Sequence, residues 1–415
     1  MPPARIIHTR DYELFCQGQL ADPYPVLREL RSTEPVHWCE PWGCWVVTSY
    51  DDVQQGHLHP CFSSDKARII MNALPGELRT RVDGLGKHLA LWVSHTDPPG
   101  HKRLRESVQQ PFVARNVAAM ETHITELACD LIDAVAPKGR LDVICDLASP
   151  LTVTVVCELL GIPPKDIDQF QAWVEEIVAF TDAPALRRPD TAEQALSGLV
   201  DLSEYFAEII RRKRAEPEGD LISTLLCRES ERDALHPDEL LAMCVQMLVG
   251  AYDTTAALIG NSVLLLLRHP EVAERLRTHP ERIETAIEEF LRYESPAPRN
   301  SRIAMADIEL GGQQIREGQT VALMLSAANR DPQQFSDPDR LDIGRSPNRH
   351  LAFGSGAHFC LGAPLARLEG QIAVTTILQK MPGLRPVDQS ALERPHWQPS
   401  TGLRMLKTLP VMFDV

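Results

Sequence analysis

The sequence lacks several features that would assign it to common classes of protein. Residues Met1 to Phe15 carry charged side chains and no apolar core, so they do not form a signal peptide. The most apolar stretch, Ala256 to Leu267, is interrupted by Asn261 and Ser262 and is too short to span a bilayer. No internal repeat or low-complexity segment is evident. We therefore expect a soluble protein of the cytoplasm that has no membrane partner.

An excess of positive charge is also missing. The 57 acidic residues outnumber the 42 lysines and arginines, and the net charge of −15 argues against a nucleic-acid partner, because phosphate binding needs a basic face. The ten cysteines lack the paired spacing of zinc ligands, which fits a reducing cytosol better than a disulfide framework. No flavin or nicotinamide fingerprint occurs, so electrons for any redox reaction would come from a separate donor.

What is present indicates a large, mostly helical protein. The chain of 415 residues exceeds the size at which a single core usually stops growing, about 250–300 residues. Two short β-rich runs lie in 35–48 around the turn Glu40-Pro41-Trp42-Gly43, and a second β-rich patch spans 308–325 with its turn at Gly311-Gly312. Apolar spacing predicts helices in 102–135, 146–160, 165–180, 192–214 and 237–269. Residues 62–96 are expected to form a mobile loop, and 329–348 a polar meander.

The most informative run is Phe353-Gly354-Ser355-Gly356-Ala357-His358-Phe359-Cys360-Leu361-Gly362, called here the cysteine loop. Its glycines permit backbone angles that are closed to other residues and a close approach to a flat ligand. Cys360 then stands at the start of a helix, where free N–H groups and the dipole favour an anion and are expected to lower its pKa. A thiolate presented in this way suits the iron of a haem.

The cysteine loop resembles the haem-binding loop of the cytochrome P450 family, whose pattern is Phe-Gly-x-Gly-x-His-x-Cys-x-Gly. The resemblance implies haem b as cofactor, Cys360 as axial iron ligand and His358 as a propionate contact, with Phe353, Gly354 and Gly362 shaping the loop. It also implies a mainly α fold with small β-sheets (α+β). A triangular-prism helical body would carry a β-rich lobe from about 1–60 and 300–330, all within one catalytic domain of residues 1–415.

Two further motifs support the resemblance. Glu289 and Arg292 stand three apart on one face of a predicted helix, as in the family's Glu-x-x-Arg motif. The resemblance implies that they form a buried network with an arginine of the meander, which we assign to Arg340. His101 and Arg105 are four apart and share a face of a helix that Thr96 or Asp97 could cap. By resemblance these two residues and Arg302 hold the haem propionates.

A long buried helix, Leu240 to Leu267, carries the third motif, Gly250-Ala251-Tyr252-Asp253-Thr254-Thr255. A threonine hydroxyl can divert a backbone hydrogen bond and bend a helix, and small residues permit close approach to a flat group. The family pattern is small-Gly-x-acid-Thr, so Asp253 and Thr254 match its proton-delivery pair. Ala251 replaces the usual glycine and narrows the groove for O₂.

The substrate is the least determined element. By analogy with the family, the pocket would draw on the 62–92 loop and the 170–200 region, with candidates Trp92, Trp173, Phe180, Met247, Ala251, Ala297 and Thr401. Each of these also reads as an ordinary core residue. The mixture suggests a medium-sized, largely apolar organic molecule, such as a natural-product scaffold.

The resemblance implies a monooxygenase that activates O₂ with two electrons from a ferredoxin and its reductase, and we expect a monomer. Lys102, Arg103, Arg115 and Arg349 are the candidates for the docking patch. Hydroxylation is the default outcome, and oxidative coupling or cyclisation is the alternative. Two other classes stay open at this point: a peroxygenase driven by H₂O₂, and a non-catalytic haem sensor or carrier.

Overall fold

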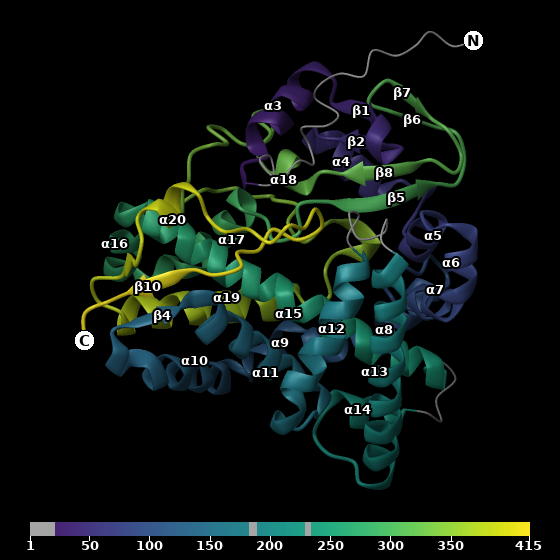
Figure 1. Cartoon of the computed structure of the whole chain (residues 1–415). Coiled ribbons are helices and arrows are strands. Elements are labelled where there is room, and N and C mark those ends of the chain that lie inside the picture. The colour runs from purple at the N-terminus through teal and green to yellow at the C-terminus, as the bar shows by residue number, and fades with distance from the viewer. Residues whose placement is uncertain (1–20, 182–188, 229–233) are drawn as a thin grey trace.

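The computed structural model describes residues 21–181, 189–228 and 234–415. The expectation for Met1 to Phe15 and the 182–188 part of the predicted substrate region therefore lie outside the described residues. A β-rich lobe lies above a larger helical body, and the long helix α15 runs through the centre of that body (Figure 1).

The β-rich lobe joins the two β-rich stretches of the sequence. Its five-stranded sheet has the order β1-β2-β8-β5-β3. Val36 pairs with Val47 across the β1–β2 hairpin, whose turn ends at Gly43 with a left-handed φ of 59°. Strand β2 then runs parallel to β8, and Cys44 pairs with Thr320. A separate β6–β7 hairpin turns at Gly311 and Gly312, and a three-stranded sheet has the order β4-β10-β9. The strands are β1 (Val36–Cys39), β2 (Cys44–Val47), β3 (Phe62–Ser63), β4 (Arg140–Asp142), β5 (Asn300–Ala304), β6 (Ile308–Leu310), β7 (Gln313–Ile315), β8 (Thr320–Leu323), β9 (Arg385–Pro386) and β10 (Pro410–Met412).

Helices form most of the described chain. The helices of the first half are α3 (Tyr24–Thr33), α4 (Tyr50–Leu58), α5 (Lys66–Asn72), α6 (Gly76–Arg81), α7 (Asp83–Ala90), α8 (Gly100–Val108), α9 (Ala114–Ala118), α10 (Glu121–Val135), α11 (Ser149–Leu160), α12 (Ile167–Thr181) and α13 (Pro189–Ala215). Those of the second half are α14 (Leu221–Cys227), α15 (Pro237–Arg268), α16 (Pro270–Thr278), α17 (Ile283–Tyr293), α18 (Leu325–Ala328), α19 (Ala363–Lys380) and α20 (Ser390–Glu393).

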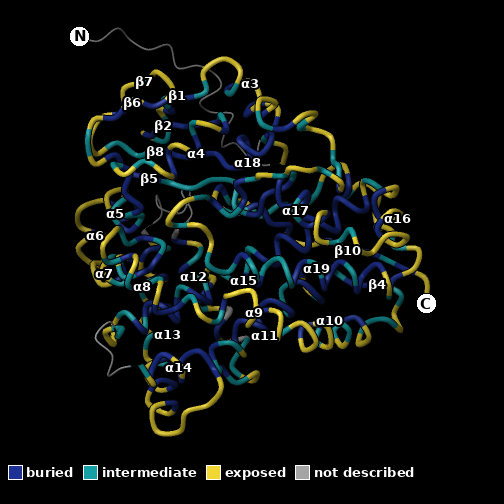
Figure 2. Tube along the Cα trace, turned by 180° about the vertical axis from the view of Figure 1, so that it is seen from behind, coloured by how far each residue is buried: buried dark blue, intermediate teal, exposed yellow. Residues whose placement is uncertain are grey.

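Helix α15 is the core element that positions the site. It begins with a capping box, in which His236 accepts from the backbone and Glu239 bonds back to His236. From Ala256 to Leu267 every residue is buried. Helices α11, α17 and α19 pack against it, and both α15 and α19 lie in the largely buried interior of the tube trace (Figure 2). A continuous apolar surface on α15 therefore fixes the helices that carry the cysteine loop and Glu289.

Three sequence expectations are wrong in detail. Residues 62–96 are not an irregular loop, because α5, α6 and α7 form there on the buried side chains Ile70, Leu78 and Leu85. The helix predicted over 102–135 is broken between α8 and α10, where Gln110–Phe112 form a short 3-10 turn that contains Pro111. The expected cap at α8 does not form: Asp97 instead accepts from the Ser63 hydroxyl at 2.5 Å and the Ser64 N–H at 2.8 Å.

The apolar helix segments are longer than the Ala256–Leu267 stretch. Two of them, Val143–Leu160 and Pro237–Arg268, are long and apolar enough to cross a membrane by composition alone. Two thirds of the most apolar window in each is buried inside the protein, at 67%. That burial is what a core helix of a soluble protein shows, since its apolar surface already contacts other helices.

Candidate active site

A cavity lies between α15, the cysteine loop and the start of α19. Its empty volume is about 940 Å³, a figure that includes open solvent at the mouth. Its walls are mostly apolar and small, which suits a broad, flat organic group. They are Phe112, Gly250, Ala251, Thr254, Thr255, Leu258, Leu291, Pro296, Ala297, Asn300, Leu325, Ala352, Phe353, His358, Cys360, Gly362, Leu365, Ala366 and Glu369.

Cys360 lines the same cavity as Thr254 of α15 and is an exposed residue. The loop is shaped by Gly354 and Gly356, whose φ angles of 70° and 73° are left-handed. The Cys360 N–H donates to the Phe353 carbonyl at 3.0 Å and closes the loop. The sequence predicts this presentation of a thiol at a helix start.

The sequence predicts a lowered pKa for the Cys360 thiol, and this prediction is wrong for the protein without haem. Burial raises this pKa above its ordinary value, although the N–H groups of Gly362 and Ala363 and the charges of Arg105 and Arg367 act in the opposite direction. A bound ferric iron would add positive charge at the sulfur and favour the thiolate over the thiol.

The walls fit a haem. A Cβ atom added to Gly250 on α15 or to Gly362 before α19 would meet no atom within 4 Å, so both glycines leave open space facing the cavity. One edge is basic, as propionates require. The Arg302 guanidinium is buried and, among the described residues, bonds to the Ser301 carbonyl and to His57; burial lowers its pKa to about 10. His101 is buried with an Nε2 atom that has no partner in the described structure.

The predicted propionate residues come together at this edge. The His101 and His358 rings lie 4.0 Å apart. Burial, followed by the charges of His101, Arg302, Lys66 and Arg105, lowers the pKa of His358 to about 2. Arg105 carries a lowered pKa because of burial, despite the attraction of Cys360. Because the charges of Arg302, Lys66 and Arg105 all act on His358, this edge is positively charged and attracts carboxylates.

The two residues predicted for proton delivery occupy different positions on α15. The Thr254 side chain lines the cavity, and its hydroxyl donates to the Gly250 carbonyl at 2.7 Å. Asp253 is partly buried and is not among the cavity walls that the structure describes. Burial, with a smaller contribution from the charge of Glu175, raises the pKa of Asp253 to about 6. A carboxyl group with that pKa can both take and give a proton near neutral pH.

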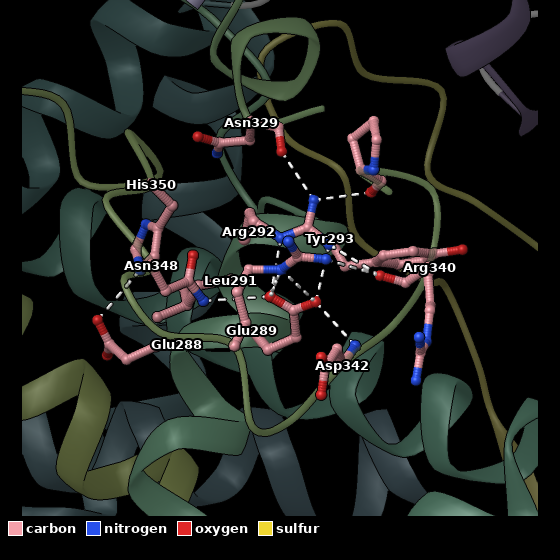
Figure 3. A network of polar contacts seen from close by, with 12 residues as sticks. Glu288, Glu289, Leu291, Arg292, Tyr293, Asn329, Arg340, Asp342, Asn348 and His350 are labelled. Atoms are coloured by element: carbon pink, nitrogen blue, oxygen red, sulfur yellow. Dashed lines mark hydrogen bonds and ion pairs between the residues drawn. The ribbon is translucent and has the colours of Figure 1, made fainter. Parts of the chain in front are cut away.

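Glu289 and Arg292 form the predicted buried ion pair, but the third arginine is not Arg340. Arg292 donates to both Glu289 oxygens at 2.8 Å, and both side chains are fully buried. Arg345 completes the network, with its Nε 3.2 Å from each Glu289 oxygen. Arg340 contributes its backbone carbonyl, which accepts from Arg292 at 3.2 Å and from Arg345 at 3.3 Å, and its exposed side chain points away from Glu289 (Figure 3). The meander turns at Asp337, which has a left-handed φ of 46°, so the later arginine returns to the carboxylate.

The neighbouring glutamate ties the same helix to the cysteine loop. Glu288 accepts from Arg367 of α19 at 2.6 and 2.9 Å and pairs with His350 at 3.1 Å (Figure 3 shows the His350 contact). The Arg367 guanidinium lies 4.6 Å above the Phe353 ring. Although burial opposes it, bonding to Arg367 and His350 lowers the pKa of Glu288 to about 2. The two glutamates of α17 therefore hold the meander and the thiolate scaffold together.

The seven substrate-pocket candidates divide. Ala251 and Ala297 line the cavity. Trp92, Trp173, Phe180 and Met247 instead contribute to the hydrophobic core, and Trp173 packs edge-on against Phe170. Thr401 lines a second cavity and accepts a hydrogen bond from Arg299 at 3.1 Å. The sequence also allowed the aromatic candidates to be ordinary core residues, and their absence from the described cavity walls favours that interpretation.

Sequence reasoning missed Arg345, Arg367, His57 and Glu369. Glu369 stands nine residues after Cys360, lines the cavity and is buried, with an Oε2 atom that has no described partner. Burial raises the pKa of this carboxyl well above its ordinary value, which favours the neutral form. No residue pattern signals such a group, although its i, i+3 position from the cavity-lining Ala366 could have placed it on the same helix face.

The fold and the cavity define a haem-thiolate protein, and the comparisons agree. The family model of cytochrome P450 matches residues 91–382. The chain is 37% identical over 397 residues to the biotin biosynthesis cytochrome P450 of Bacillus subtilis, covering 95% of this chain and 97% of the relative. It is 34% identical over 400 residues to the 6-deoxyerythronolide B hydroxylase of Saccharopolyspora erythraea, covering 95% and 96%. The crystal structure of P450BioI in complex with a hexadec-9Z-enoic acid-ligated acyl carrier protein superposes with a TM-score of 0.88 at 36% identity, covering 95% and 99%.

The chain belongs to the cytochrome P450 family. It is a haem b monooxygenase of the bacterial type, and its relatives act in biosynthesis and hydroxylation. The bound haem supplies a thiolate-ligated iron that activates O₂ with two electrons. The protein's own part is to orient the substrate, exclude water and deliver protons on the α15 side of the cavity.

Proposed function

We propose that this enzyme hydroxylates a medium-sized, largely apolar molecule at the face of the haem that α15 covers. The single observation that carries the proposal is the cavity itself, which is lined both by Cys360 and by Thr254 with small residues of α15. Cys360 is assigned as the axial ligand. His101, Arg105, Arg302 and His358 are assigned to the propionates, within one catalytic unit that works as a cytoplasmic monomer.

Proton delivery is assigned to Thr254 and Asp253. The Thr254 hydroxyl is held by the Gly250 carbonyl and faces the cavity, so it can pass a proton inward. Asp253 lies on the next position of α15, and its raised pKa suits exchange with solvent on the outer side. General acid catalysis of this kind contributes about 10²–10⁴-fold. This pair favours O₂ with an external electron donor over the H₂O₂-driven alternative.

The electron donors are proposed to be a ferredoxin and its reductase. Of the four docking candidates, Arg103 is excluded as a free charge, because it forms a two-pronged pair with Glu239 and one contact measures 3.0 Å. Lys102, Arg115 and Arg349 are exposed. Charge reversal at these three positions should lower the association rate with ferredoxin. The difference in rate from the wild type should grow as the salt concentration falls. Equal rates for the triple variant and the wild type at low salt would reject the patch.

The test of the function is optical. The reduced protein with carbon monoxide should show the strongly red-shifted Soret band of a thiolate-ligated haem, and Cys360→Ala should lose it. Substrate candidates are then screened by the spin-state shift of the ferric haem. A protein without the red-shifted band would refute the assignment of Cys360. Turnover with H₂O₂ alone, and none with ferredoxin, would replace the monooxygenase by a peroxygenase.

The structural relative with an acyl carrier protein motivates a second substrate class, a long acyl chain. The apolar cavity walls suit such a chain as well as a polycyclic scaffold. A spin-state titration with hexadec-9-enoic acid, free and attached to a carrier protein, decides between the two. Coupling or cyclisation instead of hydroxylation would appear as a product without an added oxygen atom.

A further inference from the structure

His57 is a buried histidine of α4 whose protonation state is set by its neighbours. Its Nδ1 atom lies 3.1 Å from Nη2 of Arg302. A guanidinium can only donate hydrogen bonds, so Nδ1 must carry the lone pair, and the proton of the neutral ring resides on Nε2. Burial, with the charges of Arg302 and Lys66, lowers the pKa of His57 to about 3, so the ring is neutral at pH 7. His57 therefore presents one N–H donor.

That donor has no acceptor in the described part of the chain. The Nε2 atom of His57 is buried and lacks any hydrogen-bond partner there. Buried N–H groups are almost always paired, so an orphan indicates a missing ligand. The carboxylate whose charge acts on Arg302, that of Asp97, already accepts from Ser63 and Ser64.

The His57 ring is not among the described cavity walls, but it lies beside one of them. A Cβ atom built on Gly354 of the cysteine loop would stand 3.4 Å from Cε1 of His57 and 3.5 Å from Nδ2 of Asn300. Asn300 lines the cavity, so the part of the cysteine loop that His57 contacts lies next to a cavity-lining residue. Arg302 continues from the same strand, and the charge of Lys66 reaches both His57 and His358. The surroundings are cationic, and the ligand they lack is an anion with acceptor oxygens.

We propose that His57 is a further haem-anchoring residue of this enzyme, whose neutral Nε2–H, aimed by Arg302, donates to a haem carboxylate. The inference rests on the haem-binding role of the cavity and adds a donor that the sequence motifs do not contain. Arg302 has two tasks in this arrangement: it attracts the carboxylate by its charge, and it holds the His57 ring in the donating tautomer. A substrate carboxylate is the other possible acceptor, and the test separates the two.

The experiment measures haem loss from the ferric holoenzyme to an excess of apomyoglobin. In His57→Leu the haem should leave about tenfold faster, which corresponds to about 1.4 kcal/mol. His57→Gln should recover most of the loss, because its amide N–H reaches about as far as Nε2. The matched control is His88→Leu. His88 is also a histidine with an unpartnered buried Nε2 and a lowered pKa, about 4, but it packs on Trp92 outside the cavity walls.

A spectroscopic readout separates anchoring from a general loss of stability. The propionate bending bands in the resonance Raman spectrum should shift in His57→Leu and stay unchanged in His88→Leu. If His57→Leu fails to retain haem, the same band in His57→Gln decides the question.

Three results would overturn the proposal. They are wild-type haem loss in His57→Leu, equal acceleration in His57→Leu and His88→Leu, or weakened binding of a carboxylate substrate with unchanged haem loss. A wild-type protein without the red-shifted carbonyl band would instead refute the proposed function itself.

Discussion

Removal of the Arg345 guanidinium tests the corrected network most directly. Arg345 lies in the meander and donates to both oxygens of Glu289 at 3.2 Å and to the Ser336 carbonyl at 2.8 Å. Its side chain is 9% exposed and that of Glu289 is 0% exposed, so water does not replace the lost contacts. Arg340→Ala is the matched control, since the Arg340 side chain is exposed and its bonding carbonyl remains in the variant.

The expected loss in the free energy of unfolding depends on the contacts that Glu289 keeps after the substitution. Loss of one partner of a buried ion pair costs about 3–5 kcal/mol. In Arg345→Ala the Glu289 carboxylate keeps both bonds to Arg292 at 2.8 Å, so the lower end, about 3 kcal/mol, applies. Arg340→Ala should change the free energy of unfolding by less than about 0.5 kcal/mol, as for other surface substitutions.

The assay is urea unfolding of the holoenzyme, followed by helical circular dichroism of the ferric protein and by the red-shifted band of the reduced protein with carbon monoxide. We expect a lower midpoint and earlier loss of the thiolate signal in Arg345→Ala, with wild-type curves for Arg340→Ala. The reasoning fails if Arg340→Ala is as destabilising as Arg345→Ala. The side chain that pairs with Glu289 would then be that of Arg340, as expected from the sequence.

Three other predictions follow from single groups. Thr254→Ala loses only the bond to the Gly250 carbonyl, so it should fold and consume electrons while product per electron falls about 10²-fold; unchanged coupling would contradict this. Asp253 has a folded-state pKa of about 6 against an ordinary 3.8, so its contribution to stability is full below about pH 4 and is lost as the pH rises through 6. Asp253→Asn should therefore be more stable than wild type by about 2–3 kcal/mol at pH 8 and equal at pH 4, yet slower in turnover; an equal pH dependence of the two unfolding curves would refute the burial argument. Burial raises the pKa of Glu369, so the neutral isostere in Glu369→Gln should unfold within about 1 kcal/mol of wild type at pH 7 and hold its stability better at pH 9. A loss above about 3 kcal/mol at pH 7 would mean that the carboxyl is ionised.

Local patterns predicted the elements on which the site depends. The β1–β2 hairpin, α15 and the Glu289–Arg292 pair lie where turn residues and helical spacing place them. Residues 62–96 were misjudged as a loop because Pro75 and the glycines were weighted above the buried apolar residues of α5 to α7. Tertiary packing there outweighs low helix propensity, since each short helix buries an apolar side against the body of the protein.

The sequence by itself determined the chemistry of this protein. Cys360, its flanking glycines and His358 lie within ten residues, because a thiolate loop under a flat cofactor must be built from contiguous backbone. Contacts between distant segments were decided only by the tertiary structure: Arg345 instead of Arg340 on Glu289, Arg367 on Glu288, and His57 beside Arg302, 245 positions away. The direction in which each turn of the meander points and the fit of α4 against the cysteine loop depend on packing of the whole core. No spacing within one segment encodes them, because many side chains could reach the same charge and only the folded backbone selects one.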